Sequence, residues 1–193
     1  MARGRGNVMS SNLSLSVTLT IALSGIVGEA QVHKKLEQTE QTSFSIESGI
    51  KKPVPLPSEV LELLKKDENA LAASVGCSNE GGGPGILQAS WFLASQIHLA
   101  AADEIDLVIL STNQCLNGAH VGPFWVARKT MNGYQLILST GGDGLTILRD
   151  RSNGLRDIRR ETFAAGRVSM TVYRFDGHKY GAYSDDSKPI GED

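Results

Sequence analysis

The residues that could do acid–base chemistry in this sequence are acidic side chains such as Asp103, Asp106 and Asp157. Two carboxylates about 5–10 Å apart can hydrolyse a glycosidic polymer, one as the acid and the other as the base or nucleophile. The sequence contains no Gly-x-Ser-x-Gly elbow and no His-Glu-x-x-His zinc motif. We therefore assign no catalytic residue, metal site or cofactor from the sequence, and paired-carboxylate hydrolysis stays as an alternative function.

Arginine is concentrated toward the C-terminus and supplies a candidate binding surface. The guanidinium group suits bidentate contacts with carboxylate or phosphate, so such a surface would fit an acidic partner. Acidic residues such as Asp150 and Asp157 are interleaved with the arginines, which is also the ordinary pattern of a mutually neutralised protein surface. The net charge of −2 argues against a general nucleic-acid binder. The residues of this candidate surface are Arg149, Arg151, Arg156, Arg159 and Arg160.

The chain has two cysteines, Cys77 and Cys115. In an exported protein such a pair favours a disulfide, which here would close a loop of about 40 residues. The chain-entropy model gives such a bridge about 3–4 kcal/mol of stabilisation. The alternatives are two unpaired thiols, or a nucleophilic Cys115 with His98 or His120 as its base. We predict the disulfide.

The first 30 residues have the pattern of a cleaved signal peptide. A basic start with Arg3 and Arg5 precedes an apolar run at residues 13–27, and small residues then lead to a cleavage site at Ala30. The alternative is a membrane anchor, which needs roughly 20 predominantly apolar residues, whereas this run is shorter and diluted by Ser and Thr. The sequence therefore predicts a periplasmic or secreted protein with no stable membrane span after cleavage.

The rest of the chain divides into three parts by composition. Residues 31–55 are polar, with few large apolar side chains, and such a segment buries too little surface to order itself, so we expect a flexible linker. Residues 56–184 carry the apolar patterns of a single domain, and residues 185–193 are expected to form a polar tail.

The domain pattern predicts an α+β fold, with one N-terminal helix packed on a mainly antiparallel meandering β-sheet. Ser58 is the expected N-cap of a helix over residues 59–71, whose apolar stripe would dock on the sheet. From Ser90 onward, short apolar runs alternate with glycine turns, which is typical of a meander. The predicted turns are Asn132-Gly133, residues 141–144, Asn153-Gly154 and Asp176-Gly177.

The segment from His98 to Leu107 resembles the loop of FG-GAP or VCBS-like extracellular repeats. It reads His-Leu-Ala-Ala-Ala-Asp-Glu-Ile-Asp-Leu, where those repeats carry Asp-Leu-Asn-Gly-Asp-Gly before an Asp-Leu-Val strand. The resemblance implies a hairpin of the same shape. The repeats ligate calcium through side-chain oxygens at the early positions, which here are Ala100, Ala101 and Ala102. The resemblance therefore implies the hairpin but not the metal.

More broadly, the run from Pro57 to Tyr180 resembles a group of uncharacterised bacterial secreted proteins, which implies no particular activity. We expect an exported, non-enzymatic binding module, inhibitor- or immunity-like, that acts on an extracytoplasmic protein or glycan. The alternatives are the exported hydrolase described above and a structural envelope component. The segments that carry the resemblance are residues 57–64, 106–108, 115–119, 122–126, 153–158 and 173–180.

Overall fold

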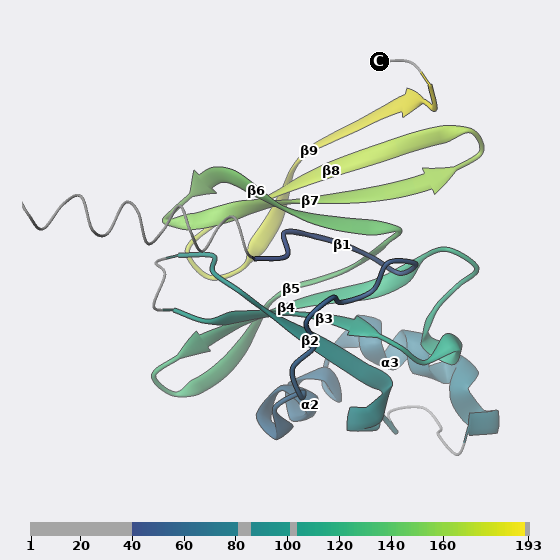
Figure 1. Ribbon diagram of the computed structural model, residues 1–193, viewed down its shortest axis with the longest axis vertical. Coiled ribbons are helices and arrows are strands. Elements are labelled where there is room, and N and C mark those ends of the chain that lie inside the picture. Colours follow the sequence, from purple (N-terminus) through teal and green to yellow (C-terminus); the bar gives the residue numbers. More distant parts are fainter. Residues whose placement is uncertain (1–39, 81–85, 101–103, 192–193) are drawn as a thin grey trace, which may run out of the picture.

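The computed structural model describes residues 40–80, 86–100 and 104–191, in which the chain forms two antiparallel β-sheets (Figure 1). Sheet A has five strands in the order β1-β6-β7-β8-β9, and sheet B has four in the order β2-β3-β4-β5. Each sheet therefore contains one meander, whereas the glycine turns predicted a single meandering sheet. The strands are β1 (Ser43–Ser45), β2 (Phe92–Ile97), β3 (Asp106–Ser111), β4 (Gly122–Thr130), β5 (Gly133–Gly142), β6 (Gly144–Ser152), β7 (Leu155–Ala164), β8 (Arg167–Phe175) and β9 (Tyr180–Pro189).

The helical segments are short and lie beside sheet B, on the side away from sheet A (Figure 1). The predicted α+β class, with one N-terminal helix packed on a single sheet, is therefore wrong, because the chain is mainly antiparallel β-structure in two sheets. The helical segments are α2 (Ser58–Leu64), α3 (Glu68–Ser74) and the 3₁₀ turns η1 (Val75–Glu80), η2 (Ala89–Trp91) and η3 (Gln114–Leu116).

Asp67 interrupts the single helix that was predicted over residues 59–71. Its backbone is extended, at φ −80° and ψ 129°, and its carboxylate accepts the Ala70 N–H as the N-cap of α3. The same oxygen accepts the indole N–H of Trp125 at 2.8 Å and the hydroxyl of Ser139 at 2.9 Å. At the start of α2 the N-cap is Pro57 rather than Ser58, and it makes no side-chain cap.

The glycines at 141–144 form a crossing between the sheets rather than the predicted hairpin turn. Sheet B ends with β5 at Gly142, and sheet A begins with β6 at Gly144, so a single residue separates strands of different sheets. A Cβ on Gly142 would lie 2.8 Å from both Cγ of Arg160 and the carbonyl oxygen of Glu161. Glycine is needed at this position because β7 passes so closely.

Apolar cores cover both faces of sheet B, and all six residues of β3 are consequently buried. The first core lies between the two sheets and joins side chains such as Leu145 and Ile158 of sheet A to Val108 and Phe124 of sheet B. The second lies between sheet B and the helices, where Val60, Leu64 and Ala70 pack with Ile109 and Trp125. The layers are thus helices, sheet B and sheet A (Figure 1).

Part of the segment predicted as a linker belongs to the fold. β1 pairs with β6, and Val54 forms a β-bridge with Ala94 of β2. At the other terminus, residues 185–189 of the predicted polar tail pair with β8 as the second half of β9. The predicted signal peptide and residues 31–39 lie outside the described residues. Among the residues that are described, no helix is long and apolar enough to cross a membrane.

Candidate functional site

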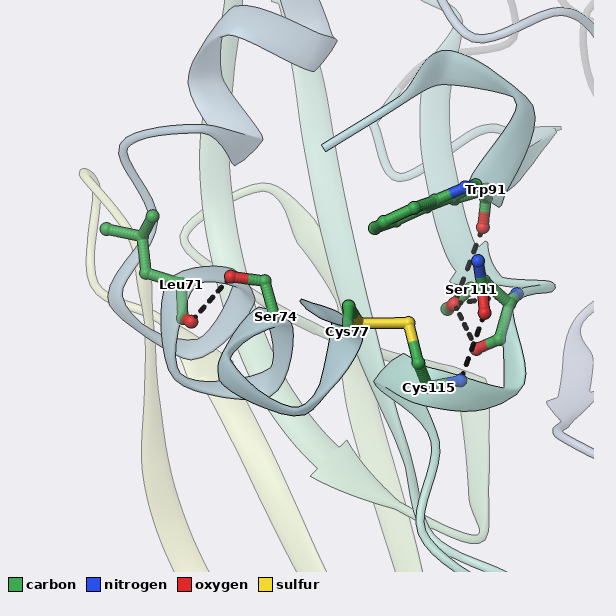
Figure 2. The surroundings of a disulfide bond; sticks show 7 residues. Leu71, Ser74, Cys77, Trp91, Ser111 and Cys115 are labelled. Carbon is green, nitrogen blue, oxygen red and sulfur yellow. Dashed lines mark hydrogen bonds between the residues drawn. A yellow bond between two sulfur atoms is a disulfide. The ribbon is translucent and has the colours of Figure 1, made fainter. Parts of the chain in front are cut away.

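The predicted disulfide between Cys77 and Cys115 is confirmed (Figure 2). It joins η1 to η3, with a Cα–Cα distance of 5.1 Å, and so attaches the helical layer to the loop between β3 and β4. The Cys115 N–H is held by the Asn113 side chain at 3.0 Å. Both cysteines of the sequence are therefore bridged, and the alternative of a nucleophilic Cys115 is wrong.

One end of the sandwich carries the β4–β5, β6–β7 and β8–β9 turns and the start of β3 (Figure 1). The crossing between β5 and β6 lies at the opposite end (Figure 1). The β4–β5 turn of sheet B and the β8–β9 turn of sheet A therefore lie at one common end. Between the turns is a cavity of about 500 Å³, which we call the end groove. Its lining residues come from the loop before β3 (Glu104, Ile105), the β4–β5 hairpin (Arg128, Lys129, Thr130, Met131, Gln135, Ile137) and the β8–β9 turn (Phe175, Gly177, His178).

Arg128 is the cation whose side chain faces the other sheet across the end groove. Its guanidinium Cζ lies 5.8 Å from the ring centroid of Phe175, and its Nη2 lies 3.2 Å from Oε2 of Glu104. Its side chain is 28% exposed. The next residue, Lys129, points to the opposite face of sheet B, because consecutive strand residues alternate, and its ammonium lies 4.3 Å from the ring centroid of Tyr134.

The β8–β9 turn lines the end groove opposite Arg128, and Asp176 fixes the conformation of this turn. The Asp176 carboxylate accepts the backbone N–H groups of His178 at 2.7 Å and Lys179 at 2.8 Å, and these hydrogen bonds lower its pKa. The Gln135 amide lies 3.5 Å from the His178 carbonyl oxygen and connects the turn to β5. The His178 side chain is exposed at the groove.

Asp106 is a fully buried carboxylate beside the end groove. Its oxygens accept the N–H of Lys129 at 3.1 Å and the N–H of Leu99 at 3.4 Å, so it ties the end of β4 to the loop after β2. Burial raises the pKa of Asp106 to about 6, against the lowering effect of those hydrogen bonds and of Arg128. Burial also raises the pKa of Tyr180, whose hydroxyl donates to the Arg156 carbonyl oxygen.

Arg156, one of the predicted surface arginines, is buried in an ionic cluster. Its Nη1 lies 3.0 Å from Oε2 of Glu40, and the two side chains are 3% and 5% exposed. Its other nitrogens donate to the carbonyl oxygens of Leu148 and Ile147. Glu40 also accepts the backbone N–H of His98. Arg156 therefore holds β6, β7 and the start of the described chain together and is not available as surface.

The other predicted arginines do not share one surface. Arg149 is exposed, and its side chain makes no hydrogen bond or ion pair with another described residue. Arg151 donates to the carbonyl oxygens of Leu99 and Ala100. Arg159 and Arg160 are consecutive residues of β7 and so lie on opposite faces of sheet A. Accordingly Arg159 pairs with Glu161, whereas Arg160 donates to Thr171 at 2.6 Å.

Two of the three acids considered for hydrolysis have structural partners. Asp106 holds two backbone N–H groups, and Asp157 is buried with its Oδ2 3.3 Å from Nε of Arg174. Asp103 lies outside the described residues. Within the residues described, no cluster of three or more His, Cys, Asp or Glu side chains could hold a metal ion.

We compared the chain with protein-family models, curated proteins and solved structures. No family model, curated protein or solved structure matches it. The resemblance to FG-GAP or VCBS-like repeats and to bacterial secreted proteins therefore stays a prediction.

Sequence reasoning missed the end groove although it identified two of the turns that form it. Asn132-Gly133 and Asp176-Gly177 were both recognisable, and Gly133 and Gly177 have the positive φ values such turns require. No sequence signal indicates that a turn of sheet B and a turn of sheet A meet.

Proposed function

We propose that this protein is an exported, non-enzymatic binding module that holds an extracytoplasmic partner protein at the end groove. Disulfides persist in oxidising compartments and are rare in the cytosol, so the Cys77–Cys115 bridge supports the export predicted from the first 30 residues.

The observation that carries the proposal is the composition of the end groove and its rim. Met131, at the tip of the β4–β5 hairpin, is fully exposed, and Ile105 is 40% exposed. Both lie beside Arg128 and Phe175. Methionine, arginine and aromatic side chains are the residues enriched in protein interfaces.

The buried carboxylates favour binding over the alternative of polymer hydrolysis. A glycosidase acid must reach the bond that it cleaves, and it needs a second carboxylate across that bond. Asp106 is fully buried and bonded to backbone N–H groups, and Asp157 is buried against Arg174. The residues that face the end groove, such as Met131 and Phe175, are of the types that bind another protein.

A capture experiment with matched variants tests this function. The exported chain is immobilised and exposed to envelope extract from its native host, and retained proteins are identified by mass spectrometry. Met131→Glu places a charge on the groove rim, whereas Val121→Glu places one on a 40% exposed residue of the β3–β4 loop. We expect a protein retained by the wild type and by Val121→Glu, and lost by Met131→Glu.

Two results would contradict the proposal. Retention of the same proteins by Met131→Glu would show that the groove rim is not the contact surface. Recovery from the host of a chain that still carries residues 13–27 would argue against the predicted cleavage, for which mass spectrometry should find an N-terminus near Gln31.

A further inference from the structure

We infer that the end groove recognises a carboxylate flanked by apolar side chains, as in an acidic and apolar peptide segment of the partner protein. The inference rests on the proposed function and adds the chemical class of the ligand. It is carried by the donors of Arg128, by the charges around them and by the apolar rim.

Within the part of the chain that the structure describes, one hydrogen-bonding edge of Arg128 is open. A guanidinium group has five N–H donors in a fixed plane. Among the described residues, Glu104 accepts from Nη2, and no acceptor is bonded to Nε or Nη1. The Phe175 ring lies 5.8 Å from Cζ, so the group is held without using those donors. A planar carboxylate is the partner that matches two neighbouring N–H groups.

The charges around Arg128 favour a carboxylate over a phosphate or a nucleic acid. Glu104 at 3.2 Å and the buried carboxylate of Asp106 already neutralise part of its charge. The neighbouring Lys129 turns away and lies over Tyr134. The chain as a whole carries a net charge of −2. A single carboxylate needs one cationic fork, whereas polyanions are held by several cations together.

The rim of the groove supplies apolar contacts on either side of that fork. Ile105 and Met131 are exposed on the rim, and Ile137 and Phe175 lie deeper. A volume of about 500 Å³ accommodates a few side chains rather than a folded surface. The ligand expected from these features is an extended segment with Asp or Glu between large apolar residues.

Peptide titrations with the purified chain test the inference. The probes are two fluorescein-labelled peptides with amidated C-termini, Gly-Leu-Glu-Leu-Gly and Gly-Leu-Gln-Leu-Gly, and binding is followed by fluorescence anisotropy. We expect the Glu peptide to bind about tenfold more tightly than the Gln peptide, the usual difference for a hydrogen bond to a charged group. Arg128→Gln should remove this preference, and Arg149→Gln, which removes an equal charge from an exposed site, should retain it.

Arg128→Lys separates recognition from folding, because lysine keeps the positive charge but lacks the planar pair of N–H donors. We expect this variant to prefer the Glu peptide over the Gln peptide less than the wild type does and more than Arg128→Gln does. Equal binding of the two peptides by the wild type would overturn the inference, as would binding of neither, or tighter binding of a phosphoserine peptide. Those results would leave the proposed function standing if Met131→Glu still abolished partner capture.

Discussion

Replacing the buried Asp106 by asparagine should remove a specific pH dependence of stability. Its pKa is raised from an ordinary 3.8 to about 6 because the carboxylate is buried. At about 1.4 kcal/mol per pKa unit, the ionised form costs the folded state about 3 kcal/mol relative to the unfolded chain. The charged or titratable groups near it are Arg128 of β4, Glu104 of the preceding loop and Tyr180 of β9.

The sign follows from proton binding. Between pH 3.8 and about 6 the folded protein binds a proton at Asp106 that the unfolded chain does not, so the free energy of unfolding falls as the pH rises through this range. Integration from pH 5 to pH 7 gives a loss of about 1 kcal/mol from this group. Asp176 does not offset it there, because its pKa is lowered and its contribution is lost only at more acidic pH.

The assay is urea unfolding at pH 5, 6 and 7, followed by the fluorescence of the buried Trp91 and Trp125. The two proteins differ only at residue 106, so the difference between wild type and Asp106→Asn isolates Asp106. We expect the change in unfolding free energy between pH 5 and 7 to differ by about 1 kcal/mol. Asp150→Asn, a change at an exposed carboxylate, should follow the wild type. Parallel pH dependence in wild type and Asp106→Asn would refute the reasoning.

Three further predictions concern the disulfide, the crossing between the two sheets and calcium binding. Replacing both Cys77 and Cys115 by serine should lower the free energy of unfolding by about 3–4 kcal/mol, measured by urea unfolding, and a loss below about 1 kcal/mol would contradict the chain-entropy account. Gly142→Ala should cost about 1–3 kcal/mol because its Cβ would lie 2.8 Å from the backbone of β7, whereas Gly141→Ala, with its nearest neighbour at 3.8 Å, should be better tolerated. Thermal melts with millimolar calcium and with chelator should coincide, and an upward shift of several degrees that is lost in Asp106→Ala would show that the loop does bind the metal.

The turns and the disulfide could be predicted because each depends on few residues. Asn153-Gly154 adopts φ values of 47° and 86°, a conformation that asparagine and glycine favour over other residues. The chain has two cysteines, which leave a single intramolecular pairing, and this pairing is present.

The interruption of the helix and the crossing between sheets depend on contacts distant in sequence. Asp67 ends the helical pattern while its carboxylate bonds Trp125 and Ser139, which belong to β4 and β5. The glycines at 141–144 would serve a hairpin equally well. The close passage of Arg160 and Glu161 against Gly142 is a contact that the local sequence does not indicate.

By itself the sequence determined the local conformations: where the chain turns, which strands follow one another, and that its cysteines pair. Tertiary structure alone decided the end groove, because Arg128 and Phe175 belong to different sheets and meet through the stacking of two meanders. It also decided that Arg156 is buried while Arg149 is exposed. Alternating apolar residues specify that a strand has a buried face, but they do not specify which sheet covers that face or which side chains it brings together.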